Sequence, residues 1–178
     1  GFMLIAFSSA TIEGIQALLI YIIVYIIMSC GLFSIALALN TLYTKKTNHI
    51  LQSDHLFIHS LSQFHSLGKI NPVLASTFTI ILFSMAGIPP LAGFCSKFYL
   101  FFAALSSSLF LLAFIGVITS VISCFYYIRF IKIMYFQTNT NIDYTSFSSI
   151  SYENAFILAC VGFFLIFFFI YPSPLFLW

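Results

Sequence analysis

The sequence Gly-Ile-Pro-Pro-Leu-Ala-Gly-Phe-Cys-Ser-Lys, residues 87–97, interrupts an apolar stretch that would otherwise form one continuous helix. Pro89 and Pro90 have no backbone N–H, and a proline ring clashes with the carbonyl four residues earlier in a helix. Gly87 and Gly93 flank the prolines and tolerate backbone angles that other residues resist. The stretch therefore predicts a helix that is broken near its middle.

The composition places this break inside a membrane. The chain of 178 residues is 62% hydrophobic and 6% charged, whereas soluble domains contain about 25% charged residues. A helix needs about 20 apolar residues to cross a bilayer. Four long ranges contain no Asp, Glu, Lys, Arg or His: 14–44, 70–96, 98–128 and 154–178. A soluble protein would lack the polar surface to cover four such helices, so we expect one all-α membrane domain over residues 1–178.

Apolar and polar ranges alternate along this domain. We expect helices at 1–11, 15–39, 72–107, 109–136 and 154–171, the first of them partial, and polar loops at 40–70 and 137–153. If 72–107 crossed the membrane twice, the cations before it and after it would lie on opposite sides. Because cations collect on one side of membrane proteins, a single discontinuous crossing is favoured. The cations concerned are Lys45, Lys46, Lys69, Arg129 and Lys132.

The break frees backbone carbonyls, among them those of Met85 and Ala86, which lie four residues before the two prolines. Inside a membrane such carbonyls must find partners in protein or water, so a break of this kind normally lines a polar cavity. Paired half-helices mark ion or substrate sites in transporters. The alternative is a simple kink within a packed bundle.

Lys97 lies just past the break and favours the functional interpretation. A lysine at bilayer depth costs at least about 2.5 kcal/mol, so it is rarely without a role. Snorkelling to the headgroups is the alternative, but a single crossing places this lysine too deep. The four acidic residues, Glu13, Asp54, Asp143 and Glu153, lie at predicted helix ends or in loops. The counter-charge must therefore come from water, hydroxyls or another chain, and we expect Lys97 to load and release a proton.

Polar side chains recur along the predicted helix 109–136. Thr119, Ser123 and Tyr126 share one face and could relay protons, although hydroxyls in membrane helices also serve packing. Arg129 and Lys132 follow at its end. They could hold an anionic lipid headgroup such as that of cardiolipin, or act only as topology signals.

Other chemistries find no support in the sequence. The cysteines stand singly in apolar ranges and match no metal or cluster spacing: Cys30, Cys95, Cys124 and Cys160. No residue pattern suggests binding of quinone, flavin or another cofactor, and we expect none and no metal in this chain. The net charge of +2 is too small to suggest a nucleic-acid partner.

Three stretches carry a family resemblance. Residues 87–104, residues 123–136 and the opening Gly-Phe-Met-Leu-Ile-Ala-Phe with Thr-Ile-Glu-Gly-Ile-Gln-Ala-Leu-Leu-Ile (residues 1–7 and 11–20) resemble the antiporter-like membrane subunits of respiratory complex I, NADH–ubiquinone oxidoreductase. The similarity is greatest to the subunit 2 family, over its C-terminal part. It covers nearly the whole chain in order and is weakest in the ranges 41–69 and 137–153.

The resemblance implies a fold and a role. Family members contain two inverted repeats of five helices, each with one broken helix that bears a key lysine. By the motif, Lys97 corresponds to the lysine of the second broken helix, and Gly87, Pro89, Pro90 and Gly93 correspond to its break. The chain would be a multi-pass protein of the mitochondrial inner membrane, with the loop 40–70 facing the matrix. It would be a proton-translocating subunit of an NADH:ubiquinone reductase, with no redox centre of its own.

Size is where the chain departs from this family. The resemblance implies that everything before the tenth helix is absent, including the whole first repeat. Other membrane-arm subunits would be partners, and a separate polypeptide is expected to supply the N-terminal half unless that half has been lost. Two alternatives stay open: a structural half-subunit of complex I that no longer conducts protons, and a cation/proton antiporter of the same fold.

Overall fold

The computed structural model describes residues 1–47, 67–136 and 151–170, and within these ranges every regular element is a helix. In chain order the helices are α1 (Phe2–Ser9), α2 (Ile12–Thr47), α3 (Leu67–Ile70), α4 (Pro72–Ala86), α5 (Ala92–Ser106), α6 (Phe110–Phe136) and α7 (Tyr152–Ile170). The expected all-α bundle is confirmed.

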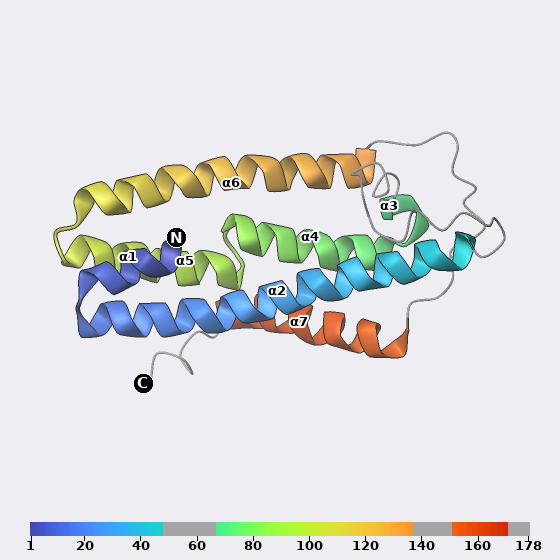
Figure 1. Ribbon diagram of the computed structural model, residues 1–178, viewed down its shortest axis with the longest axis horizontal. Helices are drawn as coiled ribbons and strands as arrows, with labels where there is room; N and C mark the ends of the chain where they lie inside the picture. The colour runs from blue at the N-terminus through green and yellow to red at the C-terminus, as the bar shows by residue number, and fades with distance from the viewer. Residues whose placement is uncertain (48–66, 137–150, 171–178) are drawn as a thin grey trace.

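Two long helices, α2 and α6, run the length of the bundle, and α4 and α5 follow one another end to end between them (Figure 1). The ranges Ile12–Ala38 and Phe110–Phe136 are long and apolar enough to cross a membrane. Helices α4 and α5 have 15 residues each. Each is therefore about 22 Å long, short of the ~30 Å hydrocarbon core. Together they form one discontinuous helix, as the sequence predicts.

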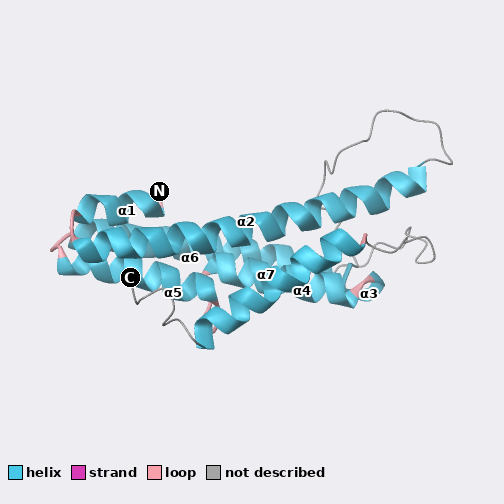
Figure 2. Ribbon diagram, turned by 90° about the horizontal axis from the view of Figure 1, so that it is seen from below, coloured by secondary structure: helices cyan, strands magenta, loops and turns pink. Residues whose placement is uncertain are grey.

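The shorter helices lie against this frame. Helix α1 packs beside α2 and α5, and α7 lies along α2 (Figures 1 and 2). The last turns of α2 and α6, together with α3, lie at the same end of the bundle. This arrangement puts residues 45 and 46, Lys69 and the end of α6 on one side, the outcome expected for a single interrupted crossing.

Local sequence explains where two of the helices begin. At α2, Thr11 Oγ1 accepts a hydrogen bond from the Gly14 N–H at 3.1 Å, which satisfies one of the free donors of the first turn. At α4, Asn71 Oδ1 accepts from the Leu74 N–H at 3.1 Å, and Pro72 occupies the first helical position, where its missing N–H has no consequence.

The expected bounds of the second helix, 15–39, are wrong at both ends. The helix starts at Ile12 because Thr11 caps it, so the polar residues after Thr11 belong to its first turn rather than to a loop. It continues to Thr47, and residues 67–70 form α3, so the expected loop 40–70 is wrong at both its ends. The prediction followed the fall in hydrophobicity, but lysine and threonine can continue a helix beyond an apolar core. Residues 48–66 and 137–150 lie outside the described ranges.

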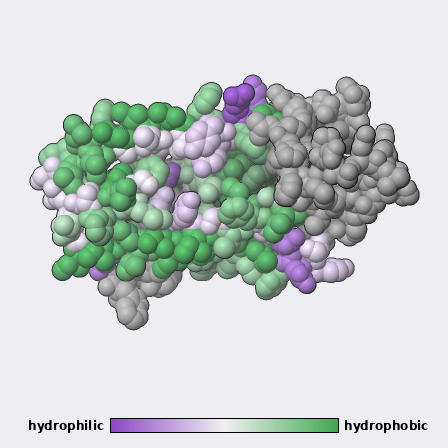
Figure 3. All heavy atoms as spheres, in the orientation of Figure 1, coloured by the Kyte–Doolittle hydropathy of each residue, from purple (hydrophilic) through white to green (hydrophobic). Residues whose placement is uncertain are grey.

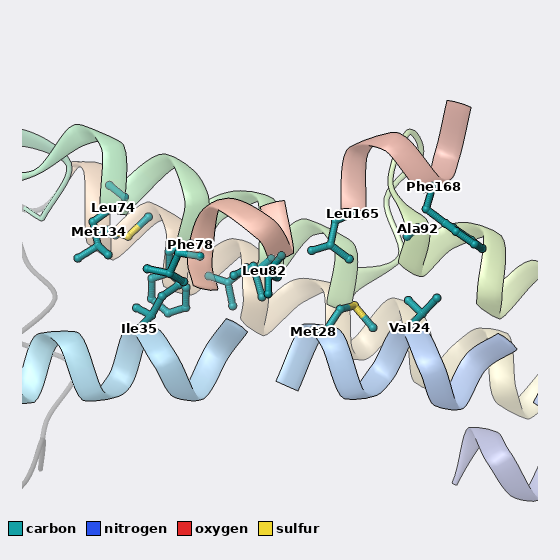
Figure 4. Packing of buried hydrophobic residues seen from close by; sticks show 14 of the residues in the cluster. Val24, Met28, Ile35, Leu74, Phe78, Leu82, Ala92, Met134, Leu165 and Phe168 are labelled. Atoms are coloured by element: carbon teal, nitrogen blue, oxygen red, sulfur yellow. The ribbon is translucent and has the colours of Figure 1, made fainter. Parts of the chain in front are cut away.

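The main core cluster contains side chains of α2, α4, α5, α6 and α7. Val24 and Met28 of α2 point toward Leu165 and Phe168 of α7, and Ala92 of α5 lies beside them (Figure 4). Side chains of α4 and α6 extend this cluster along the bundle, among them Leu74, Phe78, Leu82 and Met134. A second cluster joins α1, α2 and α5 through Ala6, Ala17, Tyr21, Leu100 and Ala103.

The outside of the bundle is also apolar. Apolar residues cover most of the described part of the face drawn in Figure 3. Large apolar side chains on α6 are strongly exposed, such as Leu111 at 73% and Phe125 at 70%. Such a surface is suited to lipid or to apolar helices of other chains rather than to water.

Candidate functional site

The site begins at the last turn of α4, where the two prolines leave two carbonyls without donors. The N–H groups of Gly87 and Ile88 turn back to the Phe83 carbonyl, each at 3.1 Å, and Gly87 also contacts the Ser84 carbonyl. These bonds close the helix in a Schellman-type turn, with Gly87 in the left-handed region at φ 84°. The next two carbonyls, of Met85 and Ala86, would bond to the N–H groups of residues 89 and 90 in a continuous helix, but proline has none.

Lys97 supplies the donors that these two carbonyls lack. Its Nζ donates to the Met85 carbonyl oxygen at 2.8 Å and to the Ala86 carbonyl oxygen at 3.3 Å. The side chain is buried, with 7% exposed. Because the carbonyl end of a helix carries partial negative charge, the end of α4 is a favourable place for an ammonium group. The carbonyls freed by the prolines are thus the acceptors of the lysine beyond the break.

Both glycines of the break stand close to other groups. A side chain at Gly87 would place its Cβ 3.1 Å from Lys97 Cδ and 3.4 Å from Lys97 Nζ. A Cβ at Gly93 would collide with the carbonyl oxygen of Ser84. The first glycine therefore leaves room for the lysine, and the second lets α5 begin directly against the end of α4.

A cavity of about 270 Å³ opens beside Lys97. Tyrosine and serine residues of α2 and α6 line part of it, together with apolar residues such as Phe2 and Met28, and no acidic residue of the described ranges lines it. The ring of Phe2 lies 5.1 Å from Lys97 Nζ, a cation–π distance. The polar lining side chains are Lys97, Ser123, Tyr21, Tyr25, Tyr126 and Tyr127.

The cavity includes two of the three predicted relay residues. Ser123 and Tyr126 line it with Lys97, but Thr119 lines a second cavity, of about 740 Å³, between α1 and α6. The hydroxyls of Thr119 and Ser123 both donate to carbonyls of α6 itself, at 2.9 Å and 2.7 Å. The residues share one helix face, as predicted, but the structure does not bring Thr119 to the cavity of the lysine.

The remaining candidate residues lie elsewhere. Arg129 and Lys132 are exposed toward the end of α6, where a lipid headgroup site stays a prediction. The four cysteines are unpaired. In the described ranges 1–47, 67–136 and 151–170, no three His, Cys, Asp or Glu side chains gather in a group that could hold a metal ion.

Comparison with known proteins identifies the family. The sequence model of the transmembrane family described as NADH:quinone oxidoreductase/Mrp antiporter matches residues 1–123, a range that contains the whole break and Lys97. The chain belongs to this family.

Relatives within it carry consistent names. NADH-ubiquinone oxidoreductase chain 2 of Marchantia polymorpha is 53% identical over 99% of this chain, and its counterpart in Arabidopsis thaliana is 47% identical over 99%. NADH-quinone oxidoreductase subunit N of Parvibaculum lavamentivorans is 36% identical, also over 99%. The chain covers 33%, 32% and 34% of these proteins, so it spans about a third of the length of the curated relatives it matches. The predicted resemblance to subunit 2 is confirmed.

A solved structure shows the same fold. A chain of respiratory complex I from Thermus thermophilus, with bound aureothin, superposes with a TM-score of 0.71. The alignment covers 97% of this chain and 35% of that chain, at 20% identity. The antiporter-family helix bundle, with its discontinuous helix, is therefore the fold of this chain.

Sequence reasoning missed two parts of this family member's site. It recognised that Met85 and Ala86 would lose their donors, but it sought the partners of Lys97 in hydroxyls, water or another chain. The positions of the two prolines could have indicated these partners, because they identify the two carbonyls that need a new donor. It also did not include Tyr21, Tyr25 or Tyr127 in the candidate site, although all three line the cavity. The i, i+4 spacing of Tyr21 and Tyr25 could have indicated a polar stripe on α2.

Proposed function

We propose that this chain is part of a proton-translocating membrane-arm subunit of NADH:ubiquinone oxidoreductase, in which Lys97 takes up and releases the proton. The observation that carries the proposal is the position of Lys97 Nζ, between two half-helices and beside a hydroxyl-lined cavity. The family and the names of the relatives support it.

The geometry suits a reversible proton site. In its ammonium form Lys97 donates to the two carbonyls at the end of α4, which hold the charge inside an apolar bundle. A cavity of about 270 Å³ has room for several waters, since one water occupies about 30 Å³ in the liquid. Neutral Lys97 takes up an incoming proton, carried to it as hydronium, and becomes an ammonium. It then gives a proton to a different water, which carries it away, and becomes a neutral amine again. Each cycle moves one proton through the lysine.

The setting follows from the same proposal. The chain acts in the mitochondrial inner membrane, with other membrane-arm subunits as partners. Lipid headgroups bind near Arg129 and Lys132. Electron transfer from NADH to ubiquinone takes place in other subunits, and this chain holds no cofactor.

Replacing Lys97 tests the proposal. In Lys97→Met the ammonium is lost, and in Lys97→Arg the charge stays but cannot be released, because guanidinium does not deprotonate in proteins. We expect both variants to lower proton pumping per assembled complex at least about tenfold, as loss of an acid–base group does. Pumping in inner-membrane vesicles, with the complex quantified on native gels, provides the measurement.

The two variants also distinguish proton transfer at Lys97 from a purely structural role of the chain. If assembled Lys97→Met complex pumps as the wild type does, the chain is a structural half-subunit and the proton-transfer proposal is wrong. If Lys97→Met is inactive but Lys97→Arg pumps normally, only a fixed positive charge is needed, and reversible protonation of Lys97 is excluded.

A further inference from the structure

Ser84 joins the two halves of the broken helix. It lies in the last turn of α4 and is fully buried, with 0% of its surface exposed. Its Oγ accepts a hydrogen bond from the Gly93 N–H at 3.1 Å and donates to Met28 Sδ at 3.2 Å. One hydroxyl thereby connects α4, α5 and α2.

The bond to Gly93 is a helix cap supplied from outside the helix. The first N–H groups of α5 have no partner within that helix. The residue just before a helix normally supplies the capping oxygen, but here that residue is Leu91, which makes no side-chain cap. Ser84 supplies the oxygen from nine positions earlier, across the break.

The contact between Ser84 and Gly93 lies close in sequence both to Lys97 and to the two residues whose carbonyls accept its hydrogen bonds. Lys97 is four residues after Gly93, one turn further along the same face of α5. Its acceptors, the carbonyls of Met85 and Ala86, belong to the two residues that follow Ser84. The contact is also tight, because a Cβ at Gly93 would meet the Ser84 carbonyl oxygen. The Ser84–Gly93 bond therefore fixes the separation between the lysine and its acceptors.

We infer that Ser84 is a positioning residue for Lys97. Its hydroxyl holds the start of α5 against the end of α4, so that the ammonium group of Lys97 reaches the carbonyls of both Met85 and Ala86. The bond to Met28 ties this arrangement to α2, the helix that also supplies Tyr21 and Tyr25 to the cavity. The inference rests on the proposed proton transfer at Lys97 and adds the residue that sets its geometry.

Ser84→Ala tests the role of the hydroxyl. We expect pumping turnover per assembled complex to fall about three- to tenfold, which is the size of effect that the loss of one net hydrogen bond produces. The KM for ubiquinone should stay unchanged, because the quinone does not bind at this site. Ser84→Thr, which keeps the hydroxyl, should restore most of the turnover.

Ser96→Ala is the matched control. Ser96 is equally buried, at 0%, but its hydroxyl donates to the Gly93 carbonyl within α5, so its loss leaves the link to α4 in place. Turnover of Ser84→Ala equal to wild type, or equal loss in Ser84→Ala and Ser96→Ala, would overturn the inference. Should Ser84→Ala not assemble, Ser84→Cys takes its place, since a thiol fills the site with weak hydrogen bonding. Wild-type turnover of that variant would also overturn it.

The lysine variants show whether the proposed function is wrong or only the positioning role of Ser84. If Lys97→Met abolishes pumping while Ser84→Ala pumps normally, the proposed function stands and only the positioning role fails. If Lys97→Met pumps normally, the proposed function fails, and the role of Ser84 fails with it.

Discussion

Gly93 is the position in the site where one added methyl group should have the largest effect. A Cβ there would collide with the carbonyl oxygen of Ser84, a backbone atom that cannot rotate away. We expect Gly93→Ala to push the two half-helices apart and to destabilise the protein by at least about 1–3 kcal/mol, the usual cost of overpacking. The thermal stability of the assembled complex, measured in detergent, provides the test.

Gly162→Ala is a control for the effect of alanine in a helix. Gly162 lies within α7, and a Cβ there would find nothing within 4 Å. This variant should assemble and melt as the wild type does, or slightly higher, because alanine favours a helix over glycine. If both variants melted alike, the close contact between Gly93 and Ser84 would not exist in the assembled protein.

The partners of Lys97 show how far a sequence can predict a site. Two prolines identify the carbonyls that lose their donors, because the rule connects each proline to the residue four positions earlier. Pro89 and Pro90 thereby mark Met85 and Ala86. The donor that replaces the lost N–H groups depends on how α5 is placed after the turn. That placement is set by the contact between Ser84 and Gly93, which no spacing along the chain announces.

Helix α6 carries the predicted relay, and its packing divides that relay. Ser123 and Tyr126 face the cavity of Lys97, while Thr119 faces the cavity beside α1. Tyr127 also lines the lysine cavity, and its ring centroid lies 4.6 Å from that of Tyr126. Periodicity shows that three hydroxyls share a face, but it cannot show which neighbouring helix covers each part of that face. The cavity of Thr119 lies between α1 and the first half of α6, where Leu112 and Gly116 also line it.

This division predicts different effects for single hydroxyl deletions on α6. In Tyr126→Phe and Tyr127→Phe the ring stays and only the hydroxyl is lost, so a contribution to proton transfer should lower pumping by about two- to tenfold. Thr119→Val, which is close in shape, should leave pumping unchanged. Pumping rates per assembled complex provide the measurement. A loss in Thr119→Val equal to that in the tyrosine variants would restore the relay along the whole helix face.

The helix ends were harder to predict than the helices. Hydrophobicity identified the apolar part of α2, but the helix extends to Thr47, beyond the last apolar residue of the expected span. Hydrophobicity measures where a segment can contact lipid, whereas backbone hydrogen bonds continue while local propensity and caps allow them. The break between α4 and α5 was predictable because proline and glycine act on the backbone directly.

At the scale of the whole molecule, the outer surface determines what must surround the chain. Of the 18 residues that form the most apolar part of α6, 11% are buried inside the bundle. Phe110, Phe114 and Val121 are each more than 60% exposed. No acidic residue of the described ranges lines the cavity beside Lys97. The exposed face of α6 requires a cover of lipid or of apolar helices from other chains, and the proposed function places it in the membrane arm.

We therefore expect this chain to migrate with complex I on native gels of mildly solubilised mitochondrial membranes. Mass spectrometry of that band should find other membrane-arm subunits. Replacing Phe114, which is 66% exposed on α6, with alanine should weaken this association if protein covers that face. The same change at Phe163 of α7, which is 69% exposed, shows whether that face is covered too. Recovery of the chain alone, away from every complex I subunit, would rule out both the proton-transfer role and the structural role, because each requires the assembled membrane arm.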